Sequence, residues 1–246
     1  MRTLVVVPTY VEAQNITELL ARVRAAVPHA DLLVVDDNSP DGTADVAEEV
    51  AQRLGQIEVL RRPTKSGLGS AYRAGFSIGI DRGYEVLVQM DADLSHDPDA
   101  LRGLLAALDS GADVAIGSRY VPGGQIPHWP VHRRALSRYG NLYASFALET
   151  GVADATSGFR AYRADALKAA DFRTTRAKGY GFQIELAHRL SRLGARIVEA
   201  PIVFTDRVRG TSKMSWGIFA EELLLVTWWG VQQRARRWRA TRMDGR

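Results

Sequence analysis

Short apolar runs alternate with helix-like patterns along most of this chain. The runs occupy residues 4–7, 32–35, 57–60, 86–90, 114–116 and 197–204. Between them, apolar residues recur at helical spacing over residues 16–27, 46–54, 70–81 and 101–108. Strands that alternate with helices of this length are typical of right-handed βαβ units. The pattern predicts an α/β fold with a mostly parallel sheet flanked by helices. Asn15 and Glu18 have the spacing of a capping box at the first helix.

The composition suits one such domain and excludes several other classes of protein. Hydrophobic residues make up 46% and charged residues 24% of the 246 residues, which is enough to bury a sizeable core. The absence of cysteine excludes disulfides and thiolate metal sites. Residues 3–7 resemble a first strand rather than a signal peptide, so we expect a cytoplasmic protein. A net charge of +4 is too small to indicate a nucleic-acid partner.

The C-terminal part differs in character from the rest. We expect residues 1–214 to form one domain, with a long loop at 121–130, and residues 215–246 to form an appendage. Residues 216–229 are rich in Trp and Leu and lead into an arginine-rich tail. Their uncharged part is shorter than the ~20 residues of a membrane-spanning helix. An amphipathic helix lying in the membrane interface is favoured, while a helix packed on the core and a tail that docks on an integral-membrane partner protein remain open.

Two aspartates follow the apolar run at 86–90. Ligands of open α/β sheets bind outside the carboxyl ends of the strands, where Asp91 and Asp93 are expected to lie. Two carboxylates at this spacing can converge on one hard divalent cation, which would neutralise a diphosphate leaving group. Asp97 suits the capping of the helix near Pro98, which leaves the pair for the metal. His96 is given no role.

Other strand ends and one glycine turn also carry polar residues. Asp37, after the run at 32–35, is expected to bind the ribose hydroxyls or base N–H of a nucleotide, whereas Asp41 suits the start of the next helix. The turn from Lys65 to Gly69 is neither a dinucleotide fingerprint nor a P-loop, so packing beneath a ligand and direct phosphate contact both remain open. Four basic residues are expected to contact ligand phosphates: Arg119, Arg133, Arg207 and Lys213. Arg134 and Arg138 are expected to face solvent.

Taken in order, the polar motifs resemble a known family. Those at residues 8–12, 36–43, 91–98 and 117–120 are similar to family 2 glycosyltransferases of the GT-A fold. Those at 154–160, 179–185 and 209–213 narrow the resemblance to the dolichol-phosphate (polyprenol monophosphate) mannose synthases. The match runs from about Leu4 to about Trp216. Val11 departs from the Asn usual in the first motif, and Ser95 stands where some relatives have Gln.

The resemblance implies a donor, an acceptor and a set of roles. It implies inverting transfer of mannose from GDP-mannose to a polyprenyl or dolichyl phosphate, with Mg²⁺ or Mn²⁺ as cofactor, by an enzyme peripheral on the cytoplasmic face of the membrane. Residues implied to bind the nucleotide-sugar are Pro8, Tyr10, Glu12, Asp37, Lys65, Gly69, Asp91, Asp93, Arg207 and Lys213. Asp91 and Asp93 would also bind the metal, and Arg119, Arg133 and Ser137 would bind the acceptor phosphate. A transferase that uses UDP-glucose or UDP-N-acetylglucosamine, and a non-catalytic nucleotide-sugar-binding scaffold, are the alternatives.

Overall fold

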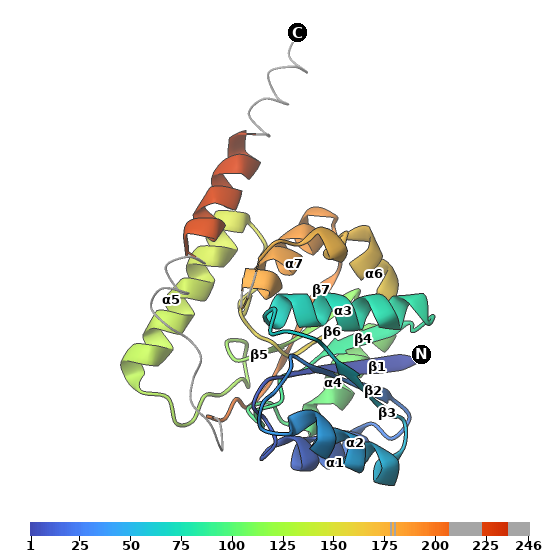
Figure 1. Cartoon of the computed structure of the whole chain (residues 1–246). Helices are drawn as coiled ribbons and strands as arrows, with labels where there is room; N and C mark the ends of the chain where they lie inside the picture. Colours follow the sequence, from blue (N-terminus) through green and yellow to red (C-terminus); the bar gives the residue numbers. More distant parts are fainter. Residues whose placement is uncertain (178, 180, 207–222, 236–246) are drawn as a thin grey trace.

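The computed structural model describes residues 1–177, 179, 181–206 and 223–235. Within this part of the chain, seven strands form one sheet in the order β3-β2-β1-β4-β6-β5-β7 (Figure 1). The strands are β1 Thr3–Thr9, β2 Asp31–Asp36, β3 Ile57–Arg61, β4 Val86–Gln89, β5 Val114–Ser118, β6 Arg160–Arg163 and β7 Ile197–Pro201. The helices are α1 Ile16–Ala26, α2 Thr43–Leu54, α3 Leu68–Asp81, α4 Leu101–Asp109, α5 Val131–Leu148, α6 Ala164–Ala169 and α7 Gly181–Arg192, with 3₁₀ turns at Pro98–Ala100 and Phe172–Thr174.

The sheet is mostly parallel, as the sequence predicts. Pairs β1–β2, β2–β3, β1–β4 and β5–β7 are parallel. Strand β6 pairs antiparallel with both β4 and β5 and had no counterpart among the predicted strands. Its insertion places the end of β4 two strands away from the end of β5. The chain is therefore α/β, as predicted, with one antiparallel strand in the middle of the sheet.

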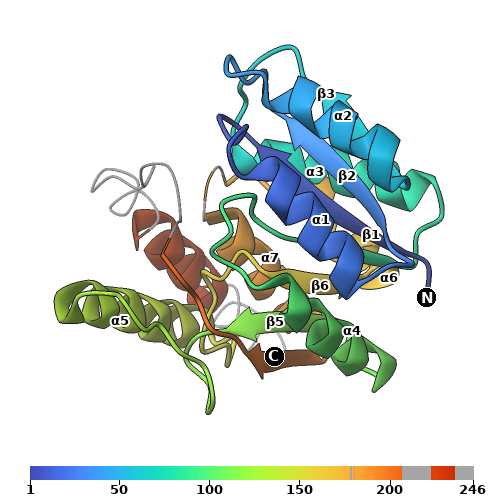
Figure 2. The ribbon, with the colours of Figure 1, turned by 90° about the horizontal axis from the view of Figure 1, so that it is seen from below.

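Helices cover both faces of the sheet (Figures 1 and 2). Because side chains of a strand alternate between faces, Leu4 and Val6 of β1 pack with α3, α6 and α7, whereas Val5 and Val7 pack with α1, α2 and α4. Helix α3 lies very close to the sheet, since a methyl group at Gly75 would overlap Val6. These two buried layers fix the strand ends that carry the polar residues.

The start of α1 differs from the prediction. Asn15 occupies the N-cap position without a side-chain cap, and its amide instead donates to Glu12 at 2.8 Å. The predicted capping box with Glu18 is therefore wrong. The amide nitrogen of Asn15 is bonded to the preceding loop instead, and its Oδ1 atom is buried without a hydrogen-bond partner.

Residues 223–235 form a helix beside α5 (Figure 1). Val226 is buried between the two helices, and a methyl group on Gly230 would lie 2.7 Å from the carbonyl oxygen of Ala147 in α5. The helix expected in the C-terminal segment is thus present over these residues. Among the helices in the described ranges, none has the length and apolar character needed to cross a membrane.

Candidate active site

The loops after β1 and β2 are held together by hydrogen bonds. Asp36 accepts from the hydroxyls of Thr9, at 2.7 Å, and Ser39, at 2.6 Å. Asp41 accepts from the amide and hydroxyl of Thr43 at the start of α2, as expected. Burial alone would raise the pKa of Asp41, but the hydrogen bonds from Thr43 and Ala13 together outweigh it and lower the pKa. These carboxylates build the rim of the site.

Asp37 organises the neighbouring turn. One of its oxygens pairs with the guanidinium of Arg62 at 2.5 Å, and the other accepts from the amides of Ser66 and Gly67, each at 3.0 Å. Its side chain is almost fully buried. The contacts explain how a carboxylate is tolerated at the end of a buried strand. Nucleotide binding by Asp37 stays a prediction, and its contacts add a role in shaping residues 62–67.

Of the other residues expected at the nucleotide, Tyr10 contacts this turn. The Lys65 ammonium lies 3.7 Å from the centre of the Tyr10 ring, and Glu12 lies in the loop that follows β1, with its amide bonded to Thr43. Pro8 is buried within β1. Gly69 is also buried, and a methyl group there would lie 2.8 Å from the carbonyl oxygen of Ala177, so close packing is the role that the structure gives it.

Asp91 and Asp93 follow β4, where the sequence places them. Asp93 is nearly buried and accepts from the Ser95 amide at 3.1 Å. Asp91 accepts from the Tyr72 hydroxyl at 3.1 Å. Asp97 accepts from the Asp99 amide at 3.1 Å, which confirms its capping role.

The donor set at Asp91 and Asp93 fits a metal that is shared with a substrate. Across residues 1–177, 179, 181–206 and 223–235, no three His, Asp or Glu side chains form a closed metal site. Two carboxylates suit a Mg²⁺- or Mn²⁺-type cation that takes its remaining ligands from substrate phosphates and water. The pair would therefore bind a cation together with a diphosphate.

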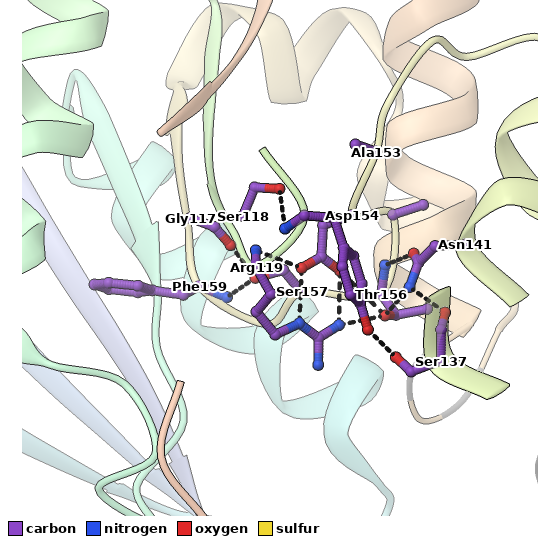
Figure 3. A network of polar contacts seen from close by, with 12 residues as sticks. Gly117, Ser118, Arg119, Ser137, Asn141, Ala153, Asp154, Thr156, Ser157 and Phe159 are labelled. Atoms are coloured by element: carbon purple, nitrogen blue, oxygen red, sulfur yellow. Dashed lines mark hydrogen bonds and ion pairs between the residues drawn. The ribbon is translucent and has the colours of Figure 1, made fainter. Parts of the chain in front are cut away.

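Arg119, which follows β5, is fixed by a buried ion pair. Its guanidinium donates to both carboxylate oxygens of Asp154, each at 2.7 Å, and to the Thr156 hydroxyl at 2.8 Å (Figure 3). Burial alone would raise the pKa of Asp154, but the charge and hydrogen bonds of Arg119 outweigh burial and lower it. The guanidinium also lies 5.3 Å from the centres of the Tyr120 and Phe204 rings.

The three residues expected at the acceptor phosphate come together. The ring of Trp129 lies 3.9 Å from the Arg133 guanidinium and 5.6 Å from that of Arg119. The Tyr120 hydroxyl donates to Ser137 at 2.6 Å. Arg133 and Ser137 belong to the first half of α5 and are half-buried, whereas Arg134 and Arg138 are exposed, as predicted.

The loop at residues 154–158 joins the two halves of the site. Its first residue, Asp154, holds Arg119, and its last, Gly158, lies against Asp91, because a methyl group there would be 2.8 Å from the Asp91 Oδ2 atom. Thr156 in the middle of the loop exchanges hydrogen bonds of 3.1 Å with Asn141 of α5. The loop thus connects Asp91 of the acidic pair with Arg119.

His96 packs in the core next to this loop. It is buried, stacks on Phe159 at 5.0 Å between ring centres and meets the edge of Phe204. Burial lowers the pKa of His96 to about 4, so the ring is neutral near pH 7. No catalytic role was expected, and the packing explains its presence.

Several site residues escaped the sequence analysis. Asp154, Thr156 and Asn141 support the arginines, and Asp206 accepts from the Trp129 indole at 2.8 Å and from Arg133 at 2.9 Å. Their partners lie 15 to 77 positions away in the sequence. One signal in the sequence could have pointed to Asp154: it is an aspartate within the polar motif at 154–160, and no role was assigned to it. Arg207 and Lys213 lie outside the described residues, so their expected roles stay predictions.

Comparisons with known proteins show which family the chain belongs to. The model of the family described as glycosyl transferase family 2 matches residues 4–170. The chain belongs to glycosyltransferase family 2. It is 50% identical over 242 residues to an undecaprenyl-phosphate mannosyltransferase of Micrococcus luteus, covering 98% of both chains. It is 49% identical over 234 residues to a polyprenol monophosphomannose synthase of Mycolicibacterium smegmatis, covering 95% of this chain and 88% of the relative.

A solved structure supports the fold assignment. A glucosyl-3-phosphoglycerate synthase of Mycobacterium tuberculosis, in complex with Mn²⁺, UDP and glucosyl-3-phosphoglycerate, has a TM-score of 0.67 with this family 2 chain at 21% identity, covering 92% of this chain and 78% of the other. The glycosyltransferase fold expected from the sequence is confirmed. The enzyme is a glycosyltransferase.

Proposed function

We propose that this glycosyltransferase moves mannose from GDP-mannose to a polyprenyl phosphate. Near-complete similarity to two relatives named for mannose transfer to polyprenyl carriers supports the sugar and the acceptor. The observation on which the proposal rests is the 154–158 loop, which ties an acidic pair suited to a donor diphosphate to an arginine cluster suited to an acceptor phosphate. GDP as the nucleotide rests on the family resemblance.

The chemistry is a single displacement. An oxygen of the acceptor phosphate attacks the anomeric carbon of mannose, the bond from that carbon to the diphosphate oxygen breaks, and GDP leaves with inversion. A phosphate monoester has a second pKa of about 6 and is largely a dianion near pH 7, so no strong general base is needed. A divalent cation, when bound by Asp91 and Asp93, supplies charge neutralisation for the leaving diphosphate. A structural relative solved with Mn²⁺ supports the use of such a cation.

The arginines have the complementary task. Two phosphates that repel one another must come within reaction distance, and Arg119 and Arg133 supply the positive charge for the acceptor. Because Asp154 and the ring of Trp129 restrain the two guanidinium groups, little side-chain freedom is lost when the phosphate binds.

The acceptor chain calls for contact with a membrane surface. Helix α5, which carries Arg133 and Ser137, exposes Tyr139, Leu142 and Phe146 further along. The adjacent helix at 223–235 exposes Leu224, Trp228 and Val231. An apolar surface over two helices with arginines nearby suits the interface of an anionic bilayer. We infer peripheral attachment, on the cytoplasmic face, through this surface, which we call the α5 surface.

Flotation with liposomes tests the attachment. The double variant L224D/W228D places two charges on the exposed side of the helix and should abolish flotation with vesicles that contain phosphatidylglycerol. Its unfolding temperature should stay near that of the wild type, because both side chains are more than half exposed. A matched control, L193D, changes an exposed leucine at the end of α7. Equal flotation of wild type and L224D/W228D would rule out attachment through the α5 surface.

Sugar transfer is tested by extraction. Purified protein is incubated with Mg²⁺, a short polyprenyl phosphate and radiolabelled GDP-mannose, and the lipid is extracted with organic solvent. Label should appear in the organic phase with the wild type and be lost with Asp91→Ala. Transfer from UDP-glucose or UDP-N-acetylglucosamine in its place would overturn the donor. No transfer from any nucleotide-sugar, while GDP-mannose still binds, would indicate the scaffold alternative.

A further inference from the structure

One tyrosine reaches the acidic pair from inside the protein. Tyr72 lies in α3 and is fully buried, and its hydroxyl donates to Asp91 Oδ1 at 3.1 Å. Its ring stacks on Phe182 of α7, with 5.9 Å between ring centres and 7° between planes, and also contacts Phe76. The ring is thus packed against two aromatic residues of the core, with its hydroxyl directed at Asp91.

Gly158 limits the same carboxylate from another side. A methyl group at this residue would lie 2.8 Å from Asp91 Oδ2, closer than real contacts allow. Gly158 does not have a left-handed backbone, so space rather than backbone conformation accounts for the glycine. The Asp91 carboxylate thus lies between the Tyr72 hydroxyl and the backbone at Gly158.

We propose that Tyr72 is a positioning residue of the donor site, which, together with Gly158, holds the Asp91 carboxylate in the orientation that binds a divalent cation and the donor diphosphate. The inference rests on the proposed function. Outer partners of this kind orient metal-binding carboxylates, and their loss typically weakens metal affinity. Tyr72 also links the helix layer of α3 and α7 to the chemistry at the end of β4.

A second buried tyrosine offers a matched control. Tyr162 is fully buried, packs edge-on against the same Phe76 ring, and donates to Gln89 at 3.3 Å rather than to a site residue. Tyr72→Phe and Tyr162→Phe each remove one buried hydroxyl from the same core. If Tyr72 only satisfied its own hydroxyl, the two variants would behave alike.

The experiment measures Mn²⁺ binding rather than turnover. Free Mn²⁺ is followed by electron paramagnetic resonance during titration of the protein with saturating GDP, and GDP affinity is measured separately in EDTA. Y72F should bind Mn²⁺ about tenfold more weakly, with GDP affinity in EDTA unchanged, while Y162F should match the wild type within about twofold. Gly158→Ala, which displaces the carboxylate without removing the hydroxyl, should also weaken Mn²⁺ binding.

The outcomes separate this inference from the proposed function. Wild-type Mn²⁺ affinity in both Y72F and G158A, with mannose transfer by the wild type intact, would overturn the positioning role alone. Equal losses in Y72F and Y162F would also overturn it, since a general core effect would then explain both. A wild-type protein that binds no Mn²⁺ with GDP and transfers no mannose would overturn the proposed function and this inference together. Thermal unfolding of each variant verifies that it is folded at the titration temperature.

Discussion

Val11 has a backbone conformation that its side chain disfavours. Its φ is 61°, in the left-handed region, where a β-branched residue is strained. Asn tolerates this region, and Asn is the residue usual at this place in the family that the chain resembles. Val at this position therefore costs stability, although its amide donates to the Ser39 hydroxyl at 3.0 Å.

Relieving this strain should stabilise the protein. We expect Val11→Asn to raise the free energy of unfolding by about 1 kcal/mol in urea denaturation. Val203→Asn is the control, because Val203 is similarly exposed, at 44% against 47%, and has no positive φ. An equal effect of both substitutions would show that polarity at an exposed site, not backbone strain, is responsible.

The ion pair between Arg119 and Asp154 also affects the stability of the protein. Both side chains are buried, so removing one charge leaves the other without compensation. We expect Asp154→Asn to lower the free energy of unfolding at pH 7 by about 3 kcal/mol. The control, Asp165→Asn, breaks the exposed pair with Lys168 and should cost less than about 0.5 kcal/mol.

The same pair gives a pH dependence of known sign. The pKa of Asp154 is lowered in the folded protein, so its contribution to stability is complete above the unfolded pKa of about 3.9. It is lost as the pH falls through the lowered folded value. The difference between wild type and D154N should therefore be constant from pH 7 to about pH 5 and shrink below pH 4. A difference that grows on acidification would contradict the assigned ion pair.

At the scale of elements, apolar periodicity predicted six strands but not β6. That strand reads Arg160-Ala161-Tyr162-Arg163, without an apolar run. Arg160 is nonetheless fully buried, because its guanidinium donates to the carbonyls of Ser157, Gln183 and Ala155. A buried charge that is satisfied by backbone carbonyl groups produces no apolar run, which is the signal by which a buried strand is predicted.

The sequence predicted at which strand ends the site lies, but it did not predict the contacts that hold the site's side chains in place. The acidic pair and Arg119 follow strands, and the ends of neighbouring strands meet at one edge of a sheet. Asp154 and Trp129 matter because of contacts with residues distant in sequence, and such contacts depend on the packing of β6 and α5 rather than on local pattern. The roles assigned to Arg133 and Ser137 came only through the resemblance.

Asn141 is the residue by which α5 is joined to the site. It is buried and exchanges two hydrogen bonds with Thr156, one through its amide and one through its carbonyl oxygen. We expect Asn141→Ala to lower the free energy of unfolding by about 2 kcal/mol. It should also raise the KM for polyprenyl phosphate, because α5 carries the two residues, Arg133 and Ser137, that are proposed to bind the acceptor. The KM for GDP-mannose should not change. His132→Ala, at an exposed position of α5, is the control. A change confined to the donor KM would show that α5 does not serve the acceptor.

Over the whole molecule, one helix links the reaction to the α5 surface. The first turns of α5 bear Arg133 and Ser137, and further along, the helix exposes Tyr139, Leu142 and Phe146. A lipid phosphate at the arginines would thus lie close to the side of the protein best suited to its hydrocarbon chain. The loops after β1 and β2, which are proposed to bind the donor, belong to the other part of the sheet (Figure 2). A water-soluble nucleotide could therefore bind there separately.

Two-substrate kinetics of Arg119→Ala tests this division most directly. Mannose transfer is measured while polyprenyl phosphate and GDP-mannose are varied in turn, with GDP binding measured separately. We predict an increase of at least about tenfold in the KM for polyprenyl phosphate, because Arg119 is proposed to give the acceptor a charged hydrogen bond of about 1.5–3 kcal/mol. The substitution also leaves the buried Asp154 without its partner, so thermal unfolding is measured alongside. The dissociation constant of GDP should be unchanged. An unchanged acceptor KM, or a loss confined to GDP-mannose, would contradict the assignment of the arginines to the acceptor.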